Sequence, residues 1–228
     1  MERESVKQLG GKKLKNYIND LLSDADFDQR ISEILLLPGR KVVNYLFSNL
    51  YSKEELVKWR SVTAMGEVVS AIADSDIESA RVVMRRLIWN LNDESGGIGW
   101  GSPESMAEII AKHDKLGEEY NRILISYINK NGNYLENEVL QQGVLWGIGR
   151  IADKKPQLVK DSFPLLEPYI KSRDSLSRGL AAKAMAAIDH EKAKPALLFL
   201  ENDNSKIIIY ENGKLAEFMI SQIVANLL

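Results

Sequence analysis

Apolar residues recur three and four positions apart along most of the chain, which is the spacing of one face of an α-helix. The clearest runs cover residues 80–91, 120–127 and 163–170. Short groups of Asp, Asn, Ser, Gly, Lys and Pro, typical of turns, lie outside these runs at residues 74–76, 131–133, 153–156 and 202–204. The pattern therefore predicts an all-α fold made of helix–turn–helix units.

Four segments of nine residues align with one another without gaps. Each has a small or aliphatic residue at its fourth position and ends in a large aliphatic residue followed by Gly or Ala. The segments are KWRSVTAMG (58–66), GWGSPESMA (99–107), QQGVLWGIG (141–149) and RGLAAKAMA (178–186). Their closing residues stand 41, 42 and 37 positions apart, and a weaker fifth copy, GKLAEFMIS (213–221), follows after 35. This spacing is typical of two-helix repeats.

One repeat pattern consists of a basic residue, then Ala three positions later, then Leu-Gly seven and eight positions later. Segment 178–186 matches this pattern best, through Arg178, Ala181, Met185 and Ala186. In this the chain resembles HEAT repeats, particularly those of phycobilisome lyase-type proteins, over about residues 58–228. The resemblance implies a right-handed α-α superhelix of about five helix pairs. We expect one HEAT-like domain over 1–228, with residues 1–57 as an N-terminal cap. The matched positions are structural, so no lyase activity is implied.

One run, KIIIY at residues 206–210, is typical of a β-strand and precedes Glu211-Asn212-Gly213. Two interpretations remain open for it. It forms a small β-hairpin over about 206–215, or it is the strained end of a helix.

The aligned segments also predict which residues face solvent. The fourth and eighth positions point inward, so the third, sixth and tenth lie on the opposite side of each helix. In HEAT-like proteins these helices line the concave side, and the residues there are candidates for binding. The candidates are Arg60, Glu67, Glu104, Glu108, Trp146, Arg150 and Lys183. Trp146 is a candidate hot spot because large aromatics dominate binding energies, or else it packs against a neighbouring helix.

A Gly-rich stretch replaces a short turn at residues 89–104 and carries Asp93, Glu94 and Trp100. Glycine lets the backbone approach a ligand closely. Ser102 is expected to cap the next helix, with Pro103 at its first position. The stretch is a peptide or protein contact loop or a structural connection. A nucleotide site is disfavoured, because the acidic residues oppose a phosphate and no P-loop lysine is present.

The amino-acid composition argues against several kinds of functional site and partner. The 228 residues include no cysteine and only two histidines, so we expect no disulfide, catalytic thiolate, bound metal or cofactor. The formal charge of −2 makes nucleic acid an unlikely partner. No apolar run is long enough to span a bilayer, and the N-terminus does not resemble a secretory signal. We therefore expect a cytoplasmic protein.

Together these features predict a non-catalytic scaffold that binds a protein or peptide on its concave face. Two alternatives remain. One is a DNA-binding protein similar to the bacterial alkylpurine DNA glycosylases, for which Trp146, Arg150, Trp100 and Asp93 offer the residue types without matching the motif. The other is an accessory or maturation factor for a cofactor-bearing enzyme. The sequence predicts neither the partner's identity nor the oligomeric state.

Overall fold

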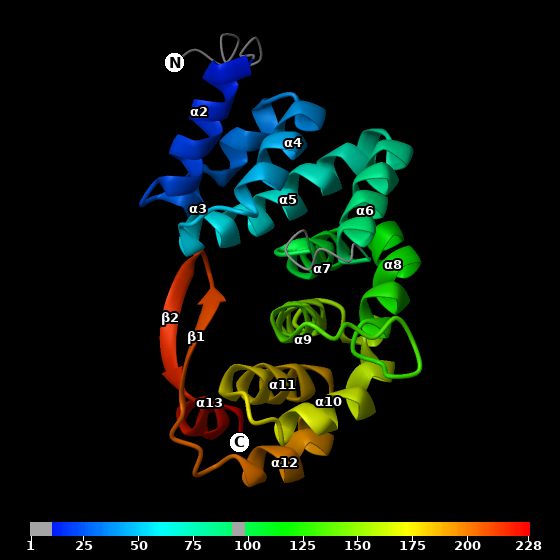
Figure 1. The fold of residues 1–228 in the computed structure, drawn as a ribbon, viewed down its shortest axis with the longest axis vertical. Coiled ribbons are helices and arrows are strands. Elements are labelled where there is room, and N and C mark those ends of the chain that lie inside the picture. The colour runs from blue at the N-terminus through cyan, green and yellow to red at the C-terminus, as the bar shows by residue number, and fades with distance from the viewer. Residues whose placement is uncertain (1–10, 93–98) are drawn as a thin grey trace. The chain divides into compact units, whose positions relative to one another are not determined.

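A computed structural model describes residues 11–92 and 99–228 (Figure 1). These residues form α-helices, short 3₁₀ helices and one two-stranded hairpin, so the predicted all-α solenoid fold with a small hairpin is confirmed. The chain divides into two compact units. The first runs to His113 and includes residues 212–214, and the second comprises residues 114–211 and 215–228.

The first unit is organised around its longest helix, α5 (Glu55–Ser75). Four helices pack against α5: α2 (Gly11–Ser23), α4 (Gly39–Asn49), α6 (Ile77–Leu91) and α7 (Ser102–Lys112). The short α3 (Phe27–Arg30) and the 3₁₀ helix η1 (Ile31–Leu36) connect α2 to α4. Pro38 is the residue that directly precedes the first turn of α4.

The second unit is organised around α11 (Ser175–Ile188), which packs against α9 (Glu138–Ala152), α10 (Phe163–Ile170), α12 (His190–Phe199) and α13 (Ile220–Leu227). The remaining elements are α8 (Asp114–Ser126), the 3₁₀ helices η2 (Pro156–Leu158) and η3 (Lys160–Ser162), and the strands β1 (Lys206–Glu211) and β2 (Lys214–Met219). Across the described residues, no helix combines the length and apolar character that crossing a bilayer requires.

Asp and Asn side chains start several helices, and one of them, Asp76, lies in a predicted turn. Asp76 accepts a hydrogen bond from the Ser79 amide at the start of α6, at 3.1 Å. Equivalent caps begin three other helices, through Asn137 for α9, Asp174 for α11 and Asp189 for α12. Each cap satisfies an amide that has no partner within the helix, which explains why the chain turns at these positions.

The fifth sequence copy does not form a helix pair. Asn212 and Gly213 have φ angles of 48° and 74° and join β1 to β2. This two-residue Asn-Gly connection is the turn that a hairpin with right-handed twist favours. The hairpin interpretation is therefore confirmed, and the alignment of residues 213–221 with the helical segments is wrong because most of them belong to β2.

The closing Gly of the repeat segments has different surroundings in different copies. A Cβ at Gly66 on α5 would lie 2.8 Å from the Cβ of Glu108 on α7. At Gly149 on α9, the nearest atom to such a Cβ is the Cα of Ala184 on α11, at 3.6 Å. Only the first contact requires glycine, since 3.6 Å is ordinary van der Waals contact.

We therefore expect the same substitution to have opposite effects at these two positions. Replacing Gly with Ala inside a helix stabilises it by about 1 kcal/mol when space allows. Gly149→Ala should raise the free energy of unfolding. Gly66→Ala should lower it by roughly 1 kcal/mol or more, because overpacking outweighs the gain in helix propensity. Urea unfolding followed by far-UV circular dichroism measures both, and shifts of the same sign would contradict this account.

Candidate functional site

Two of the three predicted binding residues in the second unit, Trp146 and Lys183, contact β1. The indole Nε1 of half-buried Trp146 donates a hydrogen bond to the Tyr210 carbonyl oxygen at 3.1 Å. Lys183 forms an ion pair with Glu211. Arg150 is half-buried on α9 and, with Lys183, opposes the rise that burial causes in the pKa of Asp153. The chain's own strand therefore covers Trp146 and Lys183.

Arg60 does not face solvent as predicted. It is 4% exposed, and its Nη1 donates to the carbonyl oxygens of Leu22 and Asp24 at 2.9 and 2.6 Å. Its Nε donates to the Gly213 carbonyl at 3.3 Å, and its guanidinium lies 5.0 Å from the centroid of the Phe27 ring. The side chain is a structural link in the first unit, because buried polar groups need such partners.

Glu104 and Glu108 were also expected in solvent and are buried instead, at 6% and 3% exposure. The reason is that α7 packs against both α5 and α6, so that every residue from Ser102 to Ala111 is buried. One carboxyl oxygen of Glu104 has no hydrogen-bond partner. Burial raises the pKa of Glu104 to about 7, and the charge of Lys58 opposes the rise.

Glu67, the remaining acidic candidate in the first unit, is partly exposed. Its carboxylate accepts a hydrogen bond from the Lys112 ammonium at 2.8 Å. Lys112 also lies 3.9 Å from the Glu108 carboxylate. These three residues form an ion-pair cluster between α5 and α7.

In the Gly-rich stretch, Asp93 and Glu94 lie outside the described residues. Trp100 is 44% exposed, and the ammonium of Lys58 lies 6.0 Å from its ring centroid. The cap of α7 is Gly101, at φ 74°, and not Ser102 as predicted. A Cβ at Gly101 would lie 2.9 Å from Leu50, so glycine suits both the backbone angle and the close approach.

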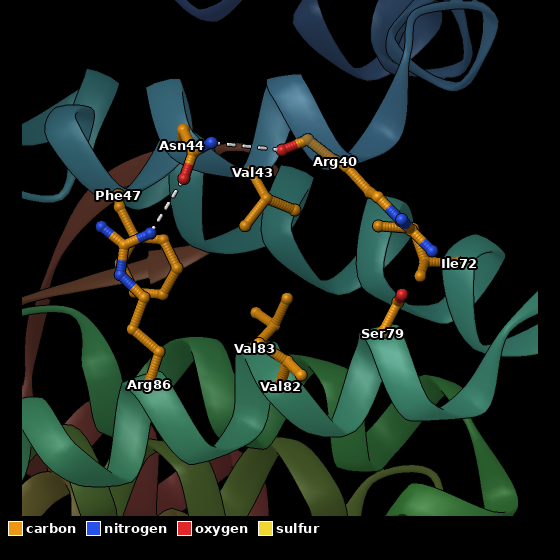
Figure 2. Close-up of a pocket in the computed structure, with 9 residues that line it drawn as sticks. All are labelled: Arg40, Val43, Asn44, Phe47, Ile72, Ser79, Val82, Val83 and Arg86. Carbon is orange, nitrogen blue, oxygen red and sulfur yellow. Dashed lines mark hydrogen bonds between the residues drawn. The ribbon is translucent and has the colours of Figure 1, made fainter.

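The first unit contains a groove between α4 and α6 with a volume of about 350 Å³ (Figure 2). We call it the α4–α6 groove and define it by its lining residues. These are Arg40, Val43, Asn44, Phe47, Ile72, Ser79, Val82, Val83 and Arg86. Figure 2 shows Arg40 and Ser79 at one end, and Arg86 with Phe47 and Asn44 at the other.

The floor and walls of the α4–α6 groove are largely apolar. Val43, Phe47 and Val83 are nearly buried, at 4%, 3% and 8% exposure. Val82 at the rim is 56% exposed. On α6 the apolar surface extends beyond the groove to Trp89, which is 64% exposed and stands seven residues after Val82, on the same side of the helix.

Arg86 is held over the apolar wall by two uncharged groups. Its guanidinium lies 3.8 Å from the centroid of the Phe47 ring, and its Nη1 donates to Asn44 Oδ1 at 2.9 Å. Asn44 is oriented in turn by a hydrogen bond from its Nδ2 to the Arg40 carbonyl, at 3.4 Å. No carboxylate of the described residues pairs with Arg86.

Arg40, at the other end, pairs with Asp76, whose side chain also accepts from Ser79 Oγ at 2.7 Å. The Ser79 hydrogen bonds and Arg40 lower the pKa of Asp76. The Arg40 side chain is 75% exposed, so this pair contributes little to stability and can exchange partners. Among residues 11–92 and 99–228, no three His, Asp or Glu side chains gather as a metal site would require.

The α4–α6 groove was not predicted from the sequence. One available signal was the pair Val82 and Trp89, which lie on the polar side of α6, away from the apolar run of that helix. Large apolar residues on a polar helix side indicate a second contact surface. The other part of the groove, from α4, carries no repeat segment and was assigned only to the N-terminal cap.

Comparisons with known proteins support the fold and leave the family open. No protein-family model matches the chain. A stretch of 131 residues is 30% identical to an uncharacterized protein of Archaeoglobus fulgidus. The match covers 58% of this chain and 62% of that protein, so it spans less than two thirds of the relative's length.

Among solved structures, the chain is similar to a designed armadillo repeat protein for modular peptide recognition, with a TM-score of 0.51 and 14% identity over 99% of this chain and 96% of that one. It is also similar to an engineered protein, with a TM-score of 0.51 and 14% identity over 93% and 96% of the two chains. These similarities show a helical-repeat solenoid fold.

The raised pKa of Glu104 predicts how stability depends on pH. The unfolded chain releases this proton near the ordinary value of 4.5 and the folded chain near 7, so stability falls as pH rises between these values. Above this window, Glu104→Gln should be more stable than the parent by up to about 3 kcal/mol, with a much smaller difference at pH about 5. Urea unfolding across this pH range measures the effect. Glu136→Gln, at an exposed position, is the control, and a difference independent of pH would refute the assignment.

Proposed function

We propose that this chain is a non-catalytic helical-repeat module that binds a peptide segment of a partner protein in the α4–α6 groove. The observation that carries the proposal is an open, apolar-walled groove whose rim residue Val82 is 56% exposed. Exposed apolar surface next to polar side chains is typical of interaction sites. The proposal retains the cytoplasmic location expected from the sequence.

The shape of the groove favours a peptide. Its volume of about 350 Å³ is at the lower end of the range of roughly 300–1,000 Å³ for small-molecule pockets. It lies between the sides of two helices, an arrangement that suits an amphipathic segment laid along them. The armadillo repeat protein of similar fold was designed for peptide recognition, which fits the use of such a fold in this way.

The proposed location differs from the concave face expected from the repeat alignment. In the second unit, β1 covers Trp146 and Lys183, which leaves less of that surface for a partner. Two polar side chains of the α4–α6 groove, Arg86 and Asn44, are already held by a hydrogen bond to each other. Such preorganisation reduces the entropy lost on binding.

A charge placed at the rim should abolish binding. Peptides that bind the parent protein, selected from a displayed random library, should lose at least about tenfold in affinity to Val82→Glu, because the new carboxylate would be desolvated against apolar side chains. Val139→Glu is the matched control, since Val139 is also a helical valine and is 48% exposed. Fluorescence anisotropy with the selected peptides measures both variants.

Two results would overturn the proposal. One is a selection that yields no peptide above background. The other is a set of peptides that bind Val82→Glu as tightly as the parent. Far-UV circular dichroism of each variant confirms that the fold is retained before affinities are compared.

A further inference from the structure

The helices that form the α4–α6 groove are basic, although the chain as a whole is not. α4 and α6 together carry five basic residues and one acidic residue, Glu78, while the whole chain has a formal charge of −2. The basic residues are Arg40, Lys41, Arg81, Arg85 and Arg86. Glu78 pairs with Arg81 on the same helix, so it does not neutralise the two arginines of the groove.

Arg86 is the group most suited to receive a partner's charge. Asn44 and the Phe47 ring fix its guanidinium, and both are neutral. A guanidinium has five donors in a planar fork that matches a carboxylate. With one Nη1 hydrogen bond to Asn44 and no carboxylate of the described residues beside it, Arg86 retains donors for an acidic group.

The two arginines stand at opposite ends of the apolar wall (Figure 2). The lining residues of α4 lie between positions 40 and 47 and those of α6 between positions 79 and 86. Seven residues of helix rise about 10 Å, or two turns. A bound helix of about two turns could therefore place apolar side chains along the wall and carboxylates at one or both ends.

From this arrangement we infer that the α4–α6 groove binds an acidic amphipathic helix of a partner protein. Apolar side chains spaced three, four and seven residues apart contact Val82 and Ile72, the apolar lining residues that are at least partly exposed. A carboxylate of the same helix pairs with Arg86, and a second one competes with Asp76 for Arg40. The inference rests on the proposed peptide-binding function and specifies the chemistry of the peptide.

The test uses two synthetic helical peptides with identical apolar positions, one with Glu and one with Lys at every polar position. Binding is measured by fluorescence anisotropy at low and at physiological salt. The parent protein should prefer the Glu peptide by at least about tenfold at low salt, and the preference should shrink as salt screens the charges.

Variants of Arg86 identify the residue responsible. Arg86→Gln should reduce the preference to a few-fold, and Arg86→Glu should reverse it. Arg122→Glu is the matched control, because it makes the same change in net charge at an exposed position on α8 and should leave the preference intact. Far-UV circular dichroism confirms folding, and Arg86→Gln remains informative if Arg86→Glu does not fold.

The outcomes separate this inference from the proposed function. Equal binding of the Glu and Lys peptides, with sensitivity to Val82→Glu, would overturn the acidic partner and leave the peptide-binding groove in place. A Glu preference that Arg86→Gln does not reduce would also overturn it. Binding of decanoate to the groove, with no binding of either peptide, would replace the helix by a small anionic amphiphile and overturn both proposals.

Discussion

Packing of α4 and α6 against α5 is the arrangement on which the α4–α6 groove depends. Ile72 of α5 forms part of the groove, and a Cβ on Gly39, the first residue of α4, would lie 3.1 Å from its side chain. Protein interiors pack as densely as organic crystals, so a side chain at position 39 would require Ile72 or α4 to shift. Because each wall is fixed to α5, the distance between Phe47 and Arg86 is fixed as well.

Packing of neighbouring helices also determines which polar side chains of the first unit are buried. Arg60 is stable in the interior because three carbonyl oxygens accept from its guanidinium. Glu104 lies between helices without a partner for one of its oxygens, and its raised pKa is the consequence. Both side chains occupy repeat positions that a single helix would expose. Neighbouring helices cover those positions, and hydrogen bonding then determines whether the covered group is stabilising.

Much of the fold could be predicted from the sequence, because it follows from local chemistry. The apolar spacing identified α6, α8 and α10, and the Asp-rich turn at residues 74–76 identified the start of α6. Asn212-Gly213 indicated the hairpin, although the repeat alignment suggested another helix there. The weak fifth copy failed because similarity of small and apolar residues does not distinguish a short strand from a helix.

The candidate site could not be predicted in the same way. Periodicity tells which side of one helix faces the core, but not what lies against its other side. Thus Trp146 was expected either on an open binding surface or against a neighbouring helix. It instead hydrogen-bonds to a strand that is 64 positions distant in sequence. The α4–α6 groove is the converse case, a surface that is open although the sequence did not predict it. Its walls come from two helices with no repeat segment in common. In the proposed complex, the apolar wall would supply most of the affinity and Arg86 the selection among partners. An arginine whose side chain is already held in place loses less conformational entropy when it pairs with a partner. The support from Asn44 and Phe47 is neutral, so the charge of Arg86 still favours a carboxylate over an uncharged group.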